Sequence, residues 1–242
     1  MKFYDLHLHV PVNDFGLAER MIKKAKWLGY TGIGVPLPPS VSDATLSQLR
    51  RLCSNCDVDM ATRIDLSPRN PDELLSQLRK YRRRFEIVAV SCRHNPVARQ
   101  AAKDRRVDLL SFPAEAFRNR CYFDAASAKL SKSGLASLEV DVCQLVLATS
   151  YDRIHLLAIL RRETKMATKF SVPIILSSGA KTENLMHKSQ DLAAIAYLFD
   201  MPSDYAIRAV SESPSSILGR NRAKLLPSFV APGIRIIKQG DC

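Results

Sequence analysis

Residues 3–29 read FYDLHLHVPVNDFGLAERMIKKAKWLG, an alternating segment followed by a run with apolar residues at helical spacing. The strand-like part spans Phe3 to His9, and the run after it ends at Gly29, a residue type that commonly terminates helices. The apolar positions of the run are Leu17, Ala18, Met21, Ile22, Ala25 and Leu28. This stretch predicts one strand–helix unit, and the rest of the chain repeats it.

Six further strand–helix units follow along the chain. Asn70–Pro71 and Asn95–Pro96 each place a capping residue before a proline at a helix start, and Gly134 is expected to end another helix. The predicted strands with their helices are Thr31–Val35 with Val41–Leu52, Val58–Leu66 with Asp72–Arg84, Glu86–Val90 with Pro96–Lys103, Val107–Ser111 with Asp124–Ser133, Leu135–Val140 with a helical region reaching about Phe170, and Val172–Ser177 with Asp191–Phe199.

The chain beyond residue 202 is predicted to be helical again, without an eighth strand. Gly219 marks the expected stop of the last helix. Residues 220–242 contain two prolines and a glycine and are interpreted as an extended C-terminal arm with one short strand, Ile234–Ile237.

Alternating strands and helices over this length predict an α/β fold, a distorted TIM-like (β/α) barrel with about seven parallel strands. We expect residues 1–242 to form a single barrel domain that carries the arm. A doubly wound open sheet is the alternative. It is disfavoured because residues 9–12, HVPV, stand where a glycine-rich dinucleotide loop would follow the first strand.

The composition is that of a globular chain with an excess of positive charge. Among 242 residues, 36 are Lys or Arg and 24 are Asp or Glu, for a formal net charge of +12. No apolar run is long enough to span a membrane and the amino-terminal segment has no signal-peptide core, so we expect a cytoplasmic protein. The six cysteines include one C-x-x-C pair, Cys53 and Cys56, without a second pair to complete a zinc site, and are expected to be reduced.

Most of the positive charge is concentrated in residues 79–106. This segment holds ten basic and two acidic residues, whereas residues 1–78 hold nine of each. Consecutive helices are neighbours on the outside of a barrel, so these charges should form one basic region. Such a region favours a nucleic acid partner, because each neutralised phosphate releases counterions. A solvated helix surface is the alternative.

The segment Asp5-Leu6-His7-Leu8-His9 places three metal-ligand side chains on one face of the first strand. A D-x-H-x-H opening resembles the first motif of the polymerase and histidinol phosphatase (PHP) metallophosphoesterases, which are distorted seven-stranded barrels with a metal cluster. Other strand ends supply only His94 and Glu139 or Asp141, and Arg63 puts a cation where that family has a carboxylate. A PHP-type metal-dependent phosphoesterase using Asp5, His7 and His9 is therefore kept as the alternative function.

Five motifs resemble the archaeal and eukaryal RNase P protein component 3 family, the thirty-kilodalton subunit related to the PHP barrel. They lie between residues 3 and 221, and His7 and His9 depart from the usual subunit toward the catalytic relatives. The motifs are Asp5-Leu6, Arg63-Ile64-Asp65-Leu66, residues 101–110 (AAKDRRVDLL), Ser177-Ser178-Gly179-Ala180, and Ser211-Glu212-Ser213-Pro214 with Ile217-Leu218.

The resemblance implies a protein subunit of ribonuclease P, the ribonucleoprotein endonuclease that removes 5′ leaders from precursor tRNA. In that family the RNA subunit carries the catalytic Mg²⁺, so no cofactor and no catalytic residue are expected on this chain. The implied partners are RNase P RNA, precursor tRNA through the holoenzyme, and a Pop5-like protein subunit. A scaffold that binds only protein stays open as a third class.

The family motifs assign RNA contacts to Arg63, Arg105 and Arg106, and Lys181 follows the Ser-Gly-Ala turn as a further phosphate contact. Charge density adds further candidates, namely Arg82, Arg83, Arg84, Arg93, Arg99 and Lys103.

Structural alternatives remain open for these motif residues. Asp104 or Asp108 can pair with Arg105 and Arg106, and Asp65 or Glu139 can hold Arg63 inside the fold. The Ser177–Ala180 segment can bind phosphate through its backbone N–H groups or form an ordinary turn.

Overall fold

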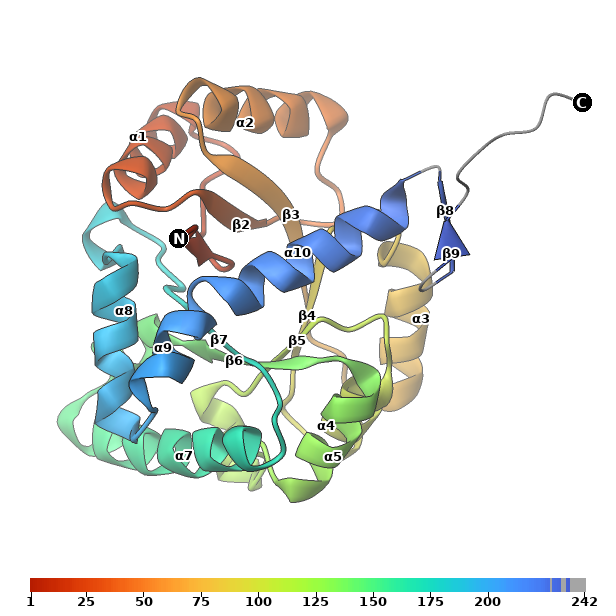
Figure 1. The fold of residues 1–242 in the computed structure, drawn as a ribbon, viewed down its shortest axis with the longest axis vertical. Coiled ribbons are helices and arrows are strands. Elements are labelled where there is room, and N and C mark those ends of the chain that lie inside the picture. Colours follow the sequence, from red (N-terminus) through yellow and green to blue (C-terminus); the bar gives the residue numbers. More distant parts are fainter. Residues whose placement is uncertain (227, 232–233, 236–242) are drawn as a thin grey trace, which may run out of the picture.

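The structure is a computed structural model that describes residues 1–226, 228–231 and 234–235. Its centre is a sheet of seven parallel strands in the order β1 to β7 (Figure 1). This arrangement confirms the predicted α/β, TIM-like barrel. The strands are β1 (Tyr4–Asp5), β2 (Gly32–Pro36), β3 (Asp59–Leu66), β4 (Ile87–Ser91), β5 (Leu109–Ser111), β6 (Ser137–Asp141) and β7 (Ile174–Ser177).

Helices follow the strands and cover the outside of the sheet (Figure 1). They are α1 (Phe15–Trp27), α2 (Asp43–Asn55), α3 (Pro71–Tyr81), α4 (Asn95–Lys103), α5 (Ala125–Gly134), α6 (Val142–Leu147), α7 (Ser150–Lys169), α8 (Ser189–Ile195), α9 (Ser203–Ala209) and α10 (Glu212–Leu225), with 3₁₀ turns at Ala114–Asn119, Glu183–Leu185 and Ala196–Phe199.

Of the two helix starts predicted at prolines, the one at Pro71 is correct and the one at Pro96 is wrong by one residue. Asn70 accepts a hydrogen bond from the Glu73 N–H at 2.9 Å, and Pro71 is the first residue of α3. At α4 the prediction is wrong by one residue, because His94 is the capping position and Asn95 already lies in the helix.

Two predicted helix ends differ from the structure. The helical region expected to reach Phe170 without interruption is two helices, because Ala148 has an extended backbone (ψ 141°) between α6 and α7. Gly134 is the last residue of α5, but the left-handed residue is Leu135, with φ of 66°. Gly134 is required for a different reason, since a Cβ there would collide with the Ala102 carbonyl at the end of α4.

The barrel is not closed by hydrogen-bonded strands between β1 and β7. In the part of the chain that the structure describes, the sheet ends at these two strands, and β1 is only two residues long instead of the predicted seven. The Tyr4 N–H donates instead to the Val210 carbonyl at 2.9 Å, and His9 N–H donates to Ala180 at 3.0 Å. We call this line of contacts the seam.

Helix α10 covers the end of the barrel where the strands begin, which we call the base (Figure 1). Ile217 and Leu218 are buried against the apolar barrel interior, and Arg222 pairs with Asp59 at 2.6 and 2.9 Å and with Glu86 at 2.6 Å.

The predicted stop at Gly219 and the predicted arm from residue 220 are wrong over residues 220–225, which continue α10. These contacts outweigh the cost of about 1 kcal/mol for a glycine inside a helix. Beyond α10, β8 (Phe229–Ala231) and β9 (Ile234–Arg235) form an antiparallel pair. The predicted strand Ile234–Ile237 is confirmed only for its first two residues, and the rest lies outside the described residues.

Two apolar layers hold the fold together. The larger layer lies between the sheet and its helices, and the smaller one fills the barrel interior with Leu6, Ile87, Leu109 and Ile175. Gly34 lets β2 lie close to the chain that follows β1, because a Cβ on residue 34 would collide with the Leu6 backbone.

Two features of the side-chain chemistry complete the description. The described cysteines Cys53, Cys56, Cys92, Cys121 and Cys143 are free thiols. Within the described ranges, no helix has the length and apolar character needed to cross a membrane.

Candidate functional site

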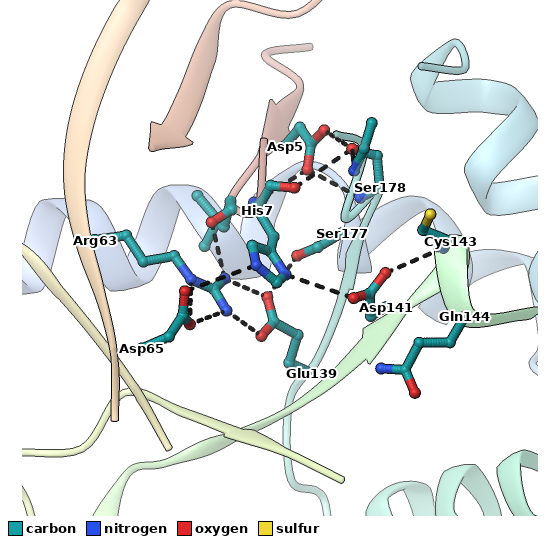
Figure 2. A network of polar contacts seen from close by, with 12 residues as sticks. Asp5, His7, Arg63, Asp65, Glu139, Asp141, Cys143, Gln144, Ser177 and Ser178 are labelled. Atoms are coloured by element: carbon teal, nitrogen blue, oxygen red, sulfur yellow. Dashed lines mark hydrogen bonds and ion pairs between the residues drawn. The ribbon is translucent and has the colours of Figure 1, made fainter. Parts of the chain in front are cut away.

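Polar side chains gather where the strands end, which we call the mouth of the barrel (Figure 2). Parallel strands bring their carboxyl ends to one side, and this is where barrel enzymes place their active sites. The cluster consists of Asp5 and His7, Arg63 and Asp65 on β3, Glu139 and Asp141 on β6, and Ser177 and Ser178 at the end of β7.

Arg63 lies at the centre of this cluster with 0% of its surface exposed. Its Nη1 and Nη2 donate to the two Glu139 carboxylate oxygens at 2.5 and 2.6 Å. Nε and Nη2 donate to Asp65 Oδ1 at 2.9 and 2.7 Å, and Nη1 also donates to the Leu6 carbonyl at 2.8 Å. Of the two alternatives for Arg63, the structure therefore shows the internal one. We assign this residue a structural role and no RNA contact.

The ion pairs decide the charge state of the two carboxylates. Burial alone would raise the pKa of Glu139, but the Arg63 guanidinium outweighs burial and lowers it. The pKa of Asp65 is lowered in the same way, against its own desolvation. Both groups are therefore charged near neutral pH, and the single charge of Arg63 pairs with both, so that the three side chains together keep one negative charge.

Asp5 joins the two sides of the seam. Its carboxylate accepts hydrogen bonds from the Ser178 N–H at 3.0 Å, from the Ser178 hydroxyl, and from the His7 N–H at 3.1 Å. Burial raises the pKa of Asp5 in spite of these bonds. Asp5, the first residue of the Asp5–His9 motif, thus makes a contact of the seam.

His7 and His9 lie beside each other, with ring centroids 4.5 Å apart. The His7 ring nitrogens lie 3.7 Å from Asp65 and 3.7 Å from Asp141. Burial and the charge of Arg63 lower the pKa of His7 to about 4, and burial lowers that of His9. Burial and the nearby Glu139 raise the pKa of Asp141 to about 7. Both imidazoles are therefore neutral at neutral pH.

These residues do not fit a PHP-type metal cluster. Asp65 and Glu139 bind Arg63, and Asp5 binds Ser178, so the carboxylates that would hold cations already have partners. Over residues 1–226 and the short described segments beyond, no three His, Cys, Asp or Glu side chains are arranged to hold a metal ion. His94 is exposed at the start of α4. A guanidinium occupies the centre of the cluster.

The predicted RNA-binding residues divide between the two ends of the barrel. Arg93 follows β4 and Lys181 follows β7, so both belong to the mouth side, and Lys181 is close enough to His9 to lower its pKa further. Arg99 lies on α4. The remaining candidates lie at or just after a helix end that precedes a strand, at the base, and are Arg82, Arg83, Arg84, Lys103, Arg105 and Arg106.

Besides Arg63, three of the predicted residues are held by acids. Arg82 pairs with the buried Asp108, Arg99 with Asp124 at 2.6 Å, and Arg106 with Asp104 at 2.7 Å. Arg106 thus follows the structural alternative, whereas Arg105 is exposed and has no ion pair among the described residues. The other exposed cations of residues 79–106 without such a pair are Arg79, Lys80, Arg83, Arg84, Arg93 and Lys103.

Helix α10 brings further cations to the base. The sequence had predicted these residues, from 220 on, to lie in an extended arm. Arg220 donates to Asp108 at 3.0 Å, which places it beside Arg82. Burial and the charges of Arg220, Arg82 and Arg105 lower the pKa of Lys224, so these side chains are close neighbours. The only sequence signal for this helical continuation was the helical spacing of apolar residues over 217–225. Gly219, a residue type that commonly ends helices, argued against it.

Comparison with known sequences identifies the family. The chain matches the family model described as RNase P subunit p30 over residues 2–225. The chain belongs to this family. It is thus a protein subunit of ribonuclease P, a tRNA-processing endonuclease.

Relatives of this RNase P subunit match it from end to end. Ribonuclease P protein component 3 of Methanosarcina barkeri is 27% identical over 240 residues, which cover 99% of this chain and 98% of the relative. The protein of the same name from Methanothermobacter thermautotrophicus is 26% identical over 243 residues, covering 99% and 97%.

The fold is shared with solved structures. A chain in the cryo-EM structure of archaeal ribonuclease P with mature tRNA superposes with a TM-score of 0.82 at 21% identity, covering 92% of this subunit and 96% of that chain. A dihydroorotase from Campylobacter jejuni superposes with a TM-score of 0.54 at 10% identity, covering 90% and 83%. The RNase P subunit therefore has the barrel architecture of TIM-like enzymes.

Proposed function

We propose that this subunit binds and stabilises the catalytic RNA of ribonuclease P through the base of its barrel, for removal of 5′ leaders from precursor tRNA. The observation that carries the proposal is the group of exposed cations at the base that have no acidic partner among the described residues. Arg83, Arg84, Lys103 and Arg105 are its members from the basic segment.

The acids at the base are already engaged, and this leaves the cations free for phosphate. Asp108 accepts from both Arg82 and Arg220, and Asp104 accepts from the Arg106 side chain. Arg222 similarly occupies Asp59 and Glu86. Arginine binds phosphate oxygens in a two-point geometry, and several such contacts add up through counterion release.

The chemistry of the mouth supports a subunit that leaves catalysis to RNA. Arg63 forms ion pairs with both Glu139 and Asp65, and the pKa of His7, lowered to about 4, leaves a neutral imidazole. Mg²⁺ on the RNA subunit, a Pop5-like protein partner and a cytoplasmic location stay predictions from the family resemblance and the sequence. Precursor tRNA is proposed as a partner through the holoenzyme.

A pair of substitutions tests the RNA-binding base. Arg83→Gln with Arg84→Gln removes two exposed charges without touching Arg82, whose pairing with Asp108 supports the fold. We expect weaker binding to RNase P RNA. The slope of log affinity against log salt concentration should become shallower by the equivalent of about two phosphate contacts, at roughly 0.9 per contact.

The matched control is Arg50→Gln with Arg51→Gln on α2, which removes the same charge from two exposed arginines elsewhere. Filter-binding titrations at several salt concentrations measure the RNA affinity of wild type and of the two double variants. Equal losses of affinity in the two variants would show a non-specific charge effect and contradict an interface at the base.

A further inference from the structure

A cavity of about 430 Å³ opens at the base, beside the cations just described. It lies where the C-terminal end of α5, the first residue of β6, the segment just before β7 and the first turns of α10 meet. Its volume is in the range of sites for small ligands, about 300–1,000 Å³. Hydroxyl groups dominate its polar lining, contributed by Ser131, Ser137, Ser171, Ser213 and Ser216.

Two buried donors in this lining have no partner. Ser131 is 1% exposed, and its hydroxyl makes no hydrogen bond in the part of the chain that the structure describes. The Nε of Arg220 is likewise buried and unbonded there, although its Nη atoms are held by Leu135 and Asp108. Buried polar groups in native proteins are nearly always hydrogen-bonded, so a pair of unused donors in one cavity indicates a missing acceptor.

The charge around the cavity favours an anionic acceptor. Lys132 and Arg220 line it, and Lys132 is exposed without an ion pair among the described residues. Helix α10 begins at the cavity, and in its first turn the N–H groups of Glu212 and Ser213 have no intrahelical partner, while Pro214 has no N–H. Glu212 is the acid in the lining, and its carboxylate pairs with Arg208 at 3.7 Å.

We propose that this cavity is a phosphate subsite that holds one backbone phosphate of the RNA. The proposal rests on the proposed function and narrows it to a site. Hydroxyl and guanidinium donors together with a helix N-terminus suit phosphate oxygens. The exposed Leu135 and Pro173 offer an apolar rim against which a ribose can pack.

RNA is favoured over a free phosphate ester because the cavity is continuous with the cationic base. Arg220 lines the cavity and shares Asp108 with Arg82, the first residue of the Arg82–Arg84 run. A strand of RNA that contacts Arg83 and Arg84 thereby has a neighbouring site for a further phosphate.

Two variants of the full chain, each with a matched control on the same helix, test the subsite. Ser131→Ala removes the unused hydroxyl, and its control Ser133→Ala removes an exposed hydroxyl that bonds to Leu130. Lys132→Gln removes the cavity charge, and its control Lys129→Gln removes an exposed charge outside the lining.

We expect Ser131→Ala to weaken binding to RNase P RNA by about tenfold or more, as for loss of one hydrogen bond to a charged group. Its denaturation midpoint should equal or exceed that of wild type, because no internal bond is lost. Lys132→Gln should reduce the slope of log RNA affinity against log salt concentration by the equivalent of about one phosphate contact. Both control variants should bind RNA like wild type. A clear loss of stability in Ser131→Ala would overturn the proposal, since the hydroxyl would then serve the fold.

Titration with inorganic phosphate, followed by NMR shifts of the Ser213 and Ser216 amides, separates the sources of phosphate. Shifts in wild type that disappear in Ser131→Ala, together with weaker RNA binding, support the proposal. Phosphate shifts with unchanged RNA affinity would overturn it in favour of a free phosphate ester. Normal RNA binding by the cavity variants, with weak binding by the Arg83 and Arg84 variant, would overturn the subsite and leave the proposed function standing. Normal binding by all variants would overturn both.

Discussion

Arg63 and Glu139, 76 positions apart in the chain, form a two-point ion pair inside the barrel, and neither side chain is more than 1% exposed. The pair joins β3 to β6 across the interior, between strands that are not neighbours in the sheet. Such a pair is sensitive to the loss of either partner, because the remaining charge is buried without compensation.

Replacing Arg63 should therefore destabilise the fold strongly. We expect Arg63→Met to lower the free energy of unfolding by about 3–5 kcal/mol, because Glu139 is left as an unpaired buried carboxylate. Urea denaturation measures the change. Arg69→Met, at an exposed position of the following loop, is the control. Adding Glu139→Gln to Arg63→Met should recover part of the loss, and a single-variant loss below about 1 kcal/mol would contradict a central role.

Glu163 on α7 should make stability fall as pH rises. It is buried, and burial raises its pKa from 4.5 to about 8. The folded state then retains a proton that the unfolded chain releases, so this stabilising contribution is complete below about pH 4.5 and is lost as pH rises to about 8. Asp141, whose pKa is raised to about 7, acts in the same direction.

Glu163→Gln isolates this effect. Glutamine keeps an oxygen that can accept from the Phe123 N–H, now bonded at 2.8 Å, and it does not ionise. We expect similar denaturation midpoints for variant and wild type near pH 5 and a higher midpoint for the variant near pH 8. The exposed Glu115→Gln should change neither. A constant difference at both pH values would rule out the titration.

Two glycines should respond to alanine in opposite directions. A Cβ at Gly219 meets no atom within 4 Å, and this residue lies inside α10, so Gly219→Ala should stabilise the protein by about 1 kcal/mol. Gly34→Ala should destabilise it by about 2–3 kcal/mol, because the methyl group collides with the Leu6 backbone. Thermal unfolding of both variants measures the contrast. Destabilisation by Gly219→Ala would contradict the continuous α10.

Removal of divalent metals should leave the stability unchanged. Arg63 already supplies the positive charge between Asp65 and Glu139, so a chelator has no structural ion to extract there. Denaturation midpoints with and without EDTA, together with elemental analysis of purified protein, check this expectation. Near-stoichiometric zinc or manganese that is lost in His7→Ala would instead favour the PHP-type phosphoesterase.

Much of the barrel was predictable because its strands are apolar runs separated by helices with a regular apolar period. The number and order of the seven strands were correct for this reason, and the Asn70–Pro71 cap was correct because Asn followed by Pro is a helix-start signal. The short β1 and the continuous α10 were not predictable, because both depend on distant contacts. Val210 accepts the Tyr4 N–H at the open edge of β1, and Arg222 pairs with Asp59 and Glu86, which are far away in the chain.

The candidate site was predictable in its residue types but less so in its partners. Sequence alone placed Arg63 near carboxylates and left its role open, since only the folded barrel shows Glu139 and Asp65 on the same guanidinium. Charge density located the basic segment without separating free cations from paired ones. Arg82 and Arg83 are adjacent, yet among the described contacts Asp108 pairs with Arg82 and not with Arg83. The cavity at the base required α10 to be a helix.

The seam also engages backbone groups at the two edges of the open sheet. A sheet that stops at two unpaired strands offers backbone donors and acceptors on which foreign strands can assemble. Here the Val210 carbonyl covers one margin, and the Asp5 carboxylate binds the Ser178 N–H beyond the other. We therefore expect the open side of the barrel to resist pairing with foreign strands, and Asp5→Ala to increase self-association, as measured by light scattering.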